Sequence, residues 1–277
     1  MQIRVLTLNV WNNEGPSQRT SLINQELKRL QPDLISFQEV VRSAEKDQLA
    51  ELTEGLGFTT THQADMQAYE PPFFDRFGGA AIATKLPLSR LEVVDLRKSG
   101  STDVPWATMA VSLALPDLGE LLFIAASSSW RLNAEAARER QALDLVDLDS
   151  RHRRELPTII AGDFNASPES ASIRFLTGLQ SLDGRSVHYH DAWTIGGQGP
   201  GWTWSDENPN AKIGIEQIVG QSSHRRRIDY VFVGGWDEHP RARAKVLDAR
   251  LAFDLPLDGL WASDHFGVLV TLEVAKN

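Results

Sequence analysis

Short apolar runs alternate with helix-like segments along this chain, and that alternation limits the fold more than any other feature of the sequence. Residues 2–9 alternate apolar and polar side chains, as a strand does. Leucine and isoleucine then recur at helical spacing over residues 18–31, and Pro32 ends that segment. A strand at 34–37 and a helix at 43–55 follow. This order of strands and helices predicts an α/β fold.

The middle of the chain changes to short runs between glycine and proline turns, which predict consecutive antiparallel strands. These runs are 80–83, 91–94, 106–111 and 121–124. The later elements repeat the layout of the first part: a helix at 134–149 capped by Asn133, a strand at 158–161, a helical stretch near 169–178, and strands at 228–233 and 266–273. No linker or low-complexity stretch divides the chain. We therefore predict one domain over residues 1–277, with two packed sheets and helices outside.

Composition and charge exclude several classes of function. The chain has no cysteine, which excludes disulfides, thiolate metal sites and cysteine nucleophiles. Its formal net charge of -9 weighs against unspecific binding to DNA. No run approaches the roughly 18 apolar residues of a membrane-spanning helix, and the N-terminus lacks the pattern of an export signal. We therefore expect a soluble, cytoplasmic monomer.

Polar side chains stand where predicted strands end or begin. They are Asn9, Glu39, the segment Gly162-Asp163-Phe164-Asn165, Asp229, and the segment Ser263-Asp264-His265. Taken singly, each is also explained as a turn former or a helix start. Loops beyond strand ends gather polar side chains over a rigid base, so we expect these groups to converge on one site.

The residue types in these segments suit phosphoester hydrolysis. That reaction needs oxygen ligands for a hard cation, a base for water, and donors to the phosphoryl oxygens. Neither a Gly-x-Ser-x-Gly nucleophile motif nor a Gly-x-x-x-x-Gly-Lys phosphate loop occurs in the sequence. A metal-activated water is therefore the simplest nucleophile left.

Taken together and in order, these motifs resemble the endonuclease/exonuclease/phosphatase superfamily, which includes DNase I-like nucleases, abasic-site endonucleases, neutral sphingomyelinases and inositol polyphosphate 5-phosphatases. The resemblance spans residues 3–273 and is carried by the segments 7–11, 36–40, 79–83, 160–165, 227–232 and 263–265. It implies a DNase I-like α/β four-layer sandwich, with two mixed, mainly antiparallel sheets face to face and helices outside. It also implies an Mg²⁺- or Mn²⁺-dependent phosphoesterase of the nuclease or phosphodiesterase type.

The resemblance also implies a role for each polar residue. The metal ligands would be Glu39, as the principal ligand, with Asn9 and Asp264. The catalytic residues would be Asp163, Asn165, Asp229 and His265. Among them, Asp163 would orient or deprotonate the attacking water, and Asn165 would donate to a phosphoryl oxygen. His265, held by Asp229, would stabilise transition-state charge or pass a proton.

One position departs from the family's pattern. Relatives carry Thr-His-Leu before the helix that contains Arg-x-Arg-Gln, here residues 138–141, whereas this chain has Ser128-Ser129-Trp130. By spacing, Ser129 stands where the family has the His that contacts the phosphate. Ser129 can still donate one hydrogen bond, and Arg131 can supply positive charge. The alternative function is a catalytically impaired protein that binds a phosphate ligand.

Four further side chains lie in the least regular stretch, residues 184–226, or next to it. Arg227 ends a basic run and is a candidate for phosphate contact, although most such runs are solvated. Trp204 either stacks on a base, covers a lipid or packs on the rim. His188 and His190 have the spacing of a strand-borne metal pair, with surface placement as the alternative.

The sequence leaves the substrate open among a nucleic acid, a phospholipid headgroup and a small phosphorylated metabolite. Specificity comes from loops that a single sequence does not position. The acidic balance slightly favours small substrates.

Overall fold

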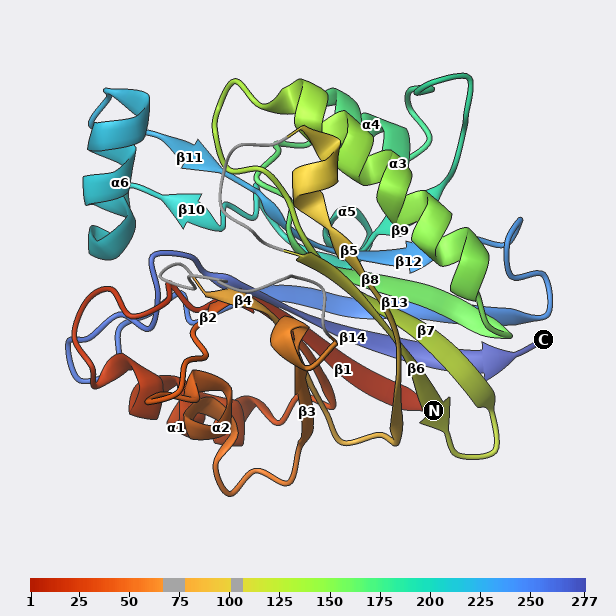
Figure 1. The fold of residues 1–277 in the computed structure, drawn as a ribbon, viewed down its shortest axis with the longest axis horizontal. Coiled ribbons are helices and arrows are strands. Elements are labelled where there is room, and N and C mark those ends of the chain that lie inside the picture. Colours follow the sequence, from red (N-terminus) through yellow and green to blue (C-terminus); the bar gives the residue numbers. More distant parts are fainter. Residues whose placement is uncertain (67–77, 101–106) are drawn as a thin grey trace.

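The structure, a computed structural model, describes residues 1–66, 78–100 and 107–277. Two six-stranded sheets pack face to face (Figure 1). The first has the order β13 (Ala242–Ala252), β14 (Gly267–Lys276), β1 (Gln2–Asn9), β2 (Leu34–Val40), β4 (Gly79–Thr84) and β3 (Thr59–His62). The second has the order β5 (Leu88–Asp95), β6 (Ala107–Leu115), β7 (Gly119–Ser127), β8 (Leu156–Asp163), β12 (Asp229–Gly234) and β9 (Tyr189–Asp191). The prediction of two mixed, mainly antiparallel sheets is confirmed.

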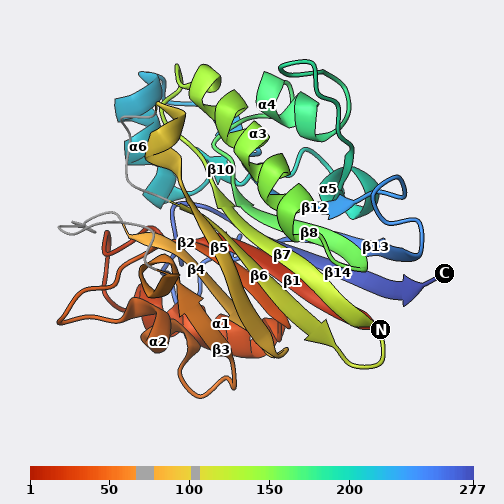
Figure 2. The same cartoon turned by 45° about the vertical axis from the view of Figure 1, so that its right-hand side comes forward.

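Helices cover the outer faces of the sandwich. Figure 2 shows α3 (Glu135–His152) and α4 (Ala171–Leu176) on one side and α1 (Arg19–Leu30) and α2 (Gln48–Thr53) on the other. The remaining elements are two short 3-10 turns (Gln63–Met66 and Leu96–Ser99), α5 (Ala192–Gly196), which packs on β13, and α6 (Pro209–Val219), which stands beside the ribbon of β10 (Trp204–Ser205) and β11 (Arg225–Arg226). The two sheets and the helices on their two outer faces together make four layers.

The alternation along the strands explains the layers. Val5 of β1 belongs to the apolar core between the two sheets, whereas its neighbour Leu6 packs under the helices of the first sheet. In the same way, Ala161 of β8 faces the inner core and Ile160 faces α3 and α4. Successive side chains of a strand point to opposite faces, so strands buried on both faces contain long apolar runs.

One parallel strand pair in each sheet fixes where polar side chains gather. β1 pairs in parallel with β2 across α1, and β7 pairs in parallel with β8 across α3. The carboxyl ends of each pair therefore lie at one edge. The two sheets are also joined directly, because Ser36 Oγ donates to the carbonyl of Ala161 at 2.9 Å.

Several local predictions were wrong. The helix expected at 43–55 is limited to α2, because Asp47 caps it and bridges back to Arg42. The run 80–83 is β4, which pairs with β2 and β3 rather than with 91–94. α3 begins at Glu135 after Ala134, so Asn133 does not cap it. Trp106, expected to start a strand, lies outside the described residues.

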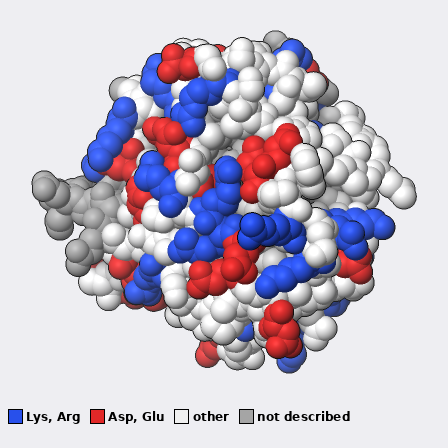
Figure 3. All heavy atoms as spheres, turned by 90° about the vertical axis from the view of Figure 1, so that its right-hand side faces the viewer, with Lys and Arg blue, Asp and Glu red and all other residues white. Residues whose placement is uncertain are grey.

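Charge and hydropathy on the outside of the sandwich agree with an ordinary surface. Figure 3 shows lysine and arginine interspersed with aspartate and glutamate on the face it presents. The net negative charge is therefore not concentrated in one acidic patch on that face. No helix in the described parts of the chain combines the length and apolar character needed to cross a membrane.

His239 gives the fold a predicted pH dependence. Burial lowers the pKa of His239 to about 4, and its Nε2 accepts a hydrogen bond from the amide of Thr158 at 3.2 Å. The unfolded chain takes up the proton below a pKa of 6.5 and the folded chain does not. The free energy of unfolding should therefore fall by roughly 2–3 kcal/mol between pH 6.5 and 4 through this group.

His239→Gln keeps an acceptor for Thr158 but does not titrate. Urea unfolding of both proteins at pH 7.5 and 4.5 isolates the effect, since all other groups are shared. We expect the variant to lose less stability on acidification than the native protein. Equal losses would exclude His239 as the source.

Candidate active site

Polar side chains of both sheets meet at the edge where β1 and β8 end. Asn9 is the last residue of β1, and its Nδ2 donates to Glu39 Oε1 of β2 at 3.0 Å and to Asp163 Oδ2 of β8 at 3.2 Å. The amide oxygen of Asn9 is held in turn by the backbone N–H of Trp11 at 2.9 Å. One side-chain amide therefore joins carboxylates from the two sheets.

The loop before β14 closes the same site. Ser263 Oγ donates to the carbonyl of Asn9 at 2.6 Å and also lies 3.3 Å from Asp264 Oδ1. His265 Nδ1 lies 3.0 Å from Asp229 Oδ2, and Asp229 is directly opposite Asp163 in the β8–β12 ladder. The structure thus brings together six of the side chains predicted for the site: Asn9, Glu39, Asp163, Asp229, Asp264 and His265. The seventh predicted residue, Asn165, is joined to Asp163 Oδ1 through its backbone N–H at 2.9 Å.

Strained backbone presents two of these side chains. Glu39 has a φ of 60° and Asn165 a φ of 51°, a conformation that disfavours ordinary side chains and that surrounding structure must hold in place. At Glu39 the register of β2 against β4 shifts between Phe37 and Val40, as in a β-bulge. Bulges next to active sites redirect a side chain, and here the bulge turns Glu39 toward Asn9.

A glycine allows the strands under the site to approach each other. A Cβ on Gly162 would lie 1.9 Å from the carbonyl oxygen of Ala126 in β7. No other residue fits there. The glycine before Asp163 is therefore required by packing, and it places the end of β8 against the end of β7.

The carboxylates of the site are crowded. Burial, and then the charge of Asp264, raises the pKa of Glu39 to about 7. Burial, and then the charge of Asp229, raises the pKa of Asp163 to about 7. Burial also raises the pKa of Asp264. Like charges held this close favour either a proton or a bound cation.

His265 provides positive charge within this cluster. Burial lowers its pKa, but the charges of Asp229, Asp264 and Asp163 raise it more, and the net pKa lies well above the usual value for histidine. The Asp229 amide donates to Thr203 Oγ1 at 3.2 Å, which fixes the residue that holds the imidazole. His265 is therefore held as an imidazolium at neutral pH.

The donor set fits a hard divalent cation. Ligand atoms of Asp163, Asp229 and, once its ring has lost a proton, His265 all lie within 4.8 Å of one another, and the buried Asp229 Oδ1 has no hydrogen-bond partner in the described chain. Glu39 and Asp264 are only partly buried and so stay open to an ion from solvent. Oxygen-rich sets of this kind suit Mg²⁺ or Mn²⁺.

Two candidate positions for such a cation follow from this geometry. The set expected from the sequence is Glu39, Asp264 and Asn9, but the Asn9 oxygen already accepts the Trp11 amide. The second set uses Asp163, Asp229 and His265. A cation there would compete with the contact between Asp229 and His265, so the geometry favours the first position with Asn9 orienting Glu39.

Sequence reasoning missed two residues near the site, of which Asn12 supports Glu39 directly and Arg19 holds the neighbouring backbone. Asn12 Nδ2 donates to Glu39 Oε2 at 2.9 Å, so both carboxylate oxygens are held by amides. The buried guanidinium of Arg19 donates to five backbone carbonyls, at 2.6 to 3.2 Å. These carbonyls belong to Val10, Trp11, Asn12, Glu14 and Ala262. In the sequence, Arg19 is recognisable only as an arginine at the start of a predicted helix, and this is a weak signal for a structural role.

Arg19 should therefore be essential for stability. Arg19→Lys keeps a positive charge but offers fewer donors, with a different geometry. We expect a loss of about 2–4 kcal/mol in the free energy of unfolding, because several buried carbonyls lose their partner. Urea unfolding measures this. Arg151→Lys, at a solvent-exposed pair with Glu92, is the matched control and should change stability by less than about 1 kcal/mol; equal effects of the two variants would contradict the assignment.

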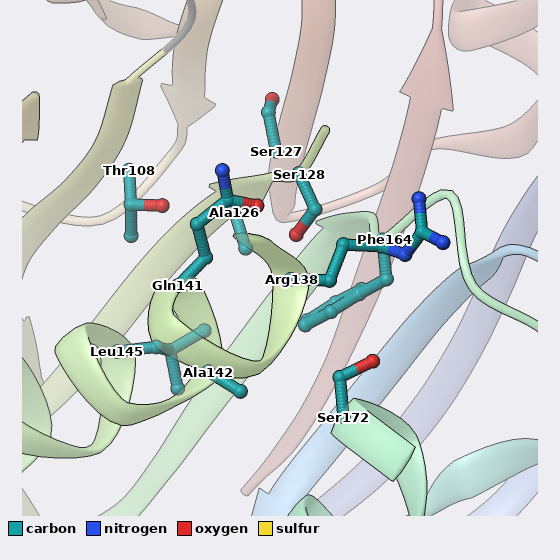
Figure 4. Close-up of a pocket in the computed structure, with 10 residues that line it drawn as sticks. All are labelled: Thr108, Ala126, Ser127, Ser128, Arg138, Gln141, Ala142, Leu145, Phe164 and Ser172. Carbon is teal, nitrogen blue, oxygen red and sulfur yellow. The ribbon is translucent and has the colours of Figure 1, made fainter. Parts of the chain in front are cut away.

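The residues expected to bind substrate occupy different environments. Ser129 is buried, and its hydroxyl accepts a hydrogen bond from Gln141 Nε2 at 2.8 Å. Arg131 is exposed, with its guanidinium over the ring of Trp130. Figure 4 shows Gln141 and Arg138 reaching from α3 toward the end of β7, around a small cavity of mixed polar and apolar lining.

Arg227 and Trp204 are used inside the fold. Arg227 is buried, pairs with Asp191 at 2.7 Å and lies over the ring of Tyr230. Trp204 is buried in the small apolar cluster under α6. The prediction that these two side chains face the substrate does not agree with these contacts. His188 and His190 stack edge to face at 4.7 Å and take part in no cluster of three metal-binding groups among the described residues.

Comparisons with known proteins agree with this geometry. A family model described as "Endonuclease/Exonuclease/phosphatase family" matches residues 6–265. The structure of truncated Caenorhabditis elegans TDP2 is similar, with 17% identity, a TM-score of 0.70 and 98% of each chain covered. Humanized D. rerio TDP2 has 18% identity and a TM-score of 0.69, covering 98% of this chain and 99% of its own.

The human Nocturnin catalytic domain with bound sulfate is also similar, with 18% identity, a TM-score of 0.65, and 99% of this chain and 95% of that chain covered. Among curated proteins no match is found. At such identities the solved structures show that the DNase I-like fold is shared.

Proposed function

The chain belongs to the endonuclease/exonuclease/phosphatase family, and we propose that it is a divalent-metal-dependent phosphoesterase that hydrolyses a phosphodiester. The observation that carries the proposal is the network of hydrogen bonds between side chains at one edge of the sandwich. There Asn9 links Glu39 to Asp163, while Asp229 holds His265. This edge combines oxygen ligands, a base and a protonated acid, which are the groups that phosphodiester hydrolysis requires.

Each residue has a proposed role in hydrolysis. Glu39 and Asp264 would hold the cation, whose positive charge would stabilise the phosphoryl oxygens. Asp163 takes a proton from the water whose oxygen attacks phosphorus. His265 gives its proton to the leaving oxygen as the phosphorus–oxygen bond breaks. Asn165 keeps one amide hydrogen for a phosphoryl oxygen, since the other is donated to the carbonyl of Ser128 at 3.2 Å.

The chemical class of substrate that we propose is a phosphodiester of nucleic acid or of a small molecule. A neighbour of the same fold, D. rerio TDP2, has been solved complexed with a single-strand DNA product, which supports including nucleic acid. The net charge of -9 favours small phosphodiesters instead.

A substrate panel tests the function. Bis-p-nitrophenyl phosphate, single-stranded and plasmid DNA, abasic duplex, sphingomyelin and sugar phosphates are each incubated with Mg²⁺, Mn²⁺ or EDTA. We expect turnover of at least one phosphodiester with either metal and none with EDTA. Turnover that survives EDTA would exclude the metal mechanism.

Ser129 supports keeping a second function, a phosphate-binding protein without turnover. Its hydroxyl is already bonded to Gln141 and brings no positive charge. Absence of hydrolysis across the panel, together with its appearance in Ser129→His, would favour this second function over the first.

A further inference from the structure

Three consecutive arginines near β11 have three different environments. Arg225 pairs with Asp206 at 2.8 Å and with Glu207 at 2.7 Å. Arg227 is buried against Asp191. Arg226 alone turns toward the candidate active site, where its Nη2 donates to the carbonyl of Asn165 at 2.8 Å. Arg225 and Arg227 therefore allow the role of Arg226 to be compared with that of the same residue type in other environments.

The charge of Arg226 is not neutralised by any carboxylate that the described residues place in contact with it. Its Nε contacts Ser167 Oγ at 3.3 Å and its Nη2 the Asn165 carbonyl, both uncharged. Its Nη1 has no hydrogen-bond partner in the described parts of the chain and is not among the buried unpaired atoms, so it reaches solvent. At least one donor is therefore directed outward beside the active site.

The charges around Arg226 also place its guanidinium beside the candidate active site. Burial, and then the charge of Arg138, lowers the pKa of Arg226, whereas Asp163 raises it. The guanidinium is thus near enough to Asp163 to feel its charge. A partly desolvated cation that no carboxylate of the described residues contacts is a ready partner for an anionic ligand.

Arg226 also lies next to the position where the family's histidine is missing. Asn165 Nδ2 donates to the carbonyl of Ser128, and Arg138 Nη1 donates to the carbonyl of Ser129 at 2.8 Å. Asn165 therefore bridges Arg226 to the end of β7. Because Ser129 is neutral and bonded to Gln141, positive charge at this corner has to come from another side chain.

We propose that Arg226 binds a non-bridging oxygen of the substrate's phosphoryl group and supplies the positive charge that Ser129 does not. This inference rests on the proposed phosphoesterase function and adds a substrate-contacting residue to it. Arg226 also positions Asn165, through the hydrogen bond to its carbonyl.

The test compares Arg226→Gln with Arg225→Gln. The second variant removes the same charge from the neighbouring residue, which forms an exposed ion pair. Turnover of bis-p-nitrophenyl phosphate and its inhibition by inorganic phosphate are measured with Mg²⁺, and Mn²⁺ affinity is measured by electron paramagnetic resonance. For Arg226→Gln we expect a roughly 10- to 100-fold loss in kcat/KM, since charge-assisted hydrogen bonds are strong. Inhibition by phosphate should weaken similarly, with Mn²⁺ affinity unchanged. Arg225→Gln should stay within about twofold of the native protein.

Arg226→Lys guards against a purely structural effect, because it keeps the charge but loses the fork that also reaches Asn165. It should bind phosphate better than Arg226→Gln. Equal phosphate inhibition in the native protein and Arg226→Gln would overturn the proposal while leaving the phosphoesterase function intact. If the native protein turns nothing over, 31P NMR titration with inorganic phosphate and Mg²⁺ decides: binding that Arg226→Gln weakens supports the subsite without catalysis, and binding that it leaves unchanged, or no binding, overturns it.

Discussion

Replacing Glu39 with glutamine is expected to lower metal-dependent phosphodiester hydrolysis by roughly 10³-fold, equivalent to about 4 kcal/mol. Glutamine keeps the shape of the side chain but removes the charge that a divalent cation needs. It also keeps only one acceptor, although Asn9 and Asn12 each donate to a different oxygen of Glu39. Release of p-nitrophenol from bis-p-nitrophenyl phosphate with Mg²⁺ or Mn²⁺ measures the loss.

Stability distinguishes this loss from misfolding. Burial and Asp264 raise the pKa of Glu39 to about 7, so at pH 8 without metal its negative charge destabilises the folded state. Removing that charge offsets the lost hydrogen bond, and we expect the free energy of unfolding to change by less than about 1 kcal/mol. Glu51→Gln on the exposed side of α2 is the matched control and should keep full activity. A Glu39→Gln protein with near-native turnover would remove Glu39 from the metal site.

The gathering of the predicted side chains could be anticipated because each of them is tied to a strand end. Asn9 and Asp163 terminate strands whose apolar residues are visible in the sequence, and parallel pairing brings such ends to one edge. The glycine at 162 is required by the close approach of Ala126. The roles of these side chains as ligand, base and acid stay predictions.

Arg19 and Thr203 could not be anticipated as supporting residues because they act through backbone atoms. Arg19 binds the carbonyls of residues 10, 11, 12 and 14 and of Ala262, and the sequence does not show that these segments meet. Thr203 is similar, since its hydroxyl accepts the amides of Ile228 and Asp229. Contacts of this kind depend on loop conformations that carry no periodic pattern.

For the three arginines 225–227, the sequence motif did not predict which side chain faces the site. Arg227 was expected to contact the phosphate, but the ribbon of β10 and β11 directs it to Asp191 and turns Arg226 toward Asn165. Strands of two residues have no recognisable alternation. The same ribbon and α6 bury Trp204, so which residue faces substrate is set by elements that the sequence did not reveal.

The missed elements have a common cause. β13 carries exposed charges on one face and small or aliphatic residues on the other, with a register shift between Val246 and Asp248. β3 is four residues long and mostly threonine. Short or bulged edge strands depart from the simple patterns that reveal central strands. The layers could therefore be predicted from the central strands, but their edges could not.

Replacing Asp163 with asparagine is expected to lower turnover by roughly 10³-fold, within the range that loss of a general base produces. Asparagine still accepts the Asn165 amide through one oxygen, as Asp163 Oδ1 does at 2.9 Å, but it does not take a proton from water. Turnover is measured with the same diester and both metals. Asp183→Asn is the matched control, because Asp183 is an exposed turn residue with a φ of 48° that asparagine tolerates.

Mn²⁺ affinity decides between the two cation positions that the geometry allows. If Glu39 and Asp264 hold the cation, Asp163→Asn should weaken Mn²⁺ binding by no more than about tenfold, the lower end of what an outer-shell partner contributes. Glu39→Gln should weaken it much further. If Asp163, Asp229 and His265 hold the cation instead, the order is reversed. In that case Asp163 cannot serve as the base, and the water must be deprotonated by another group.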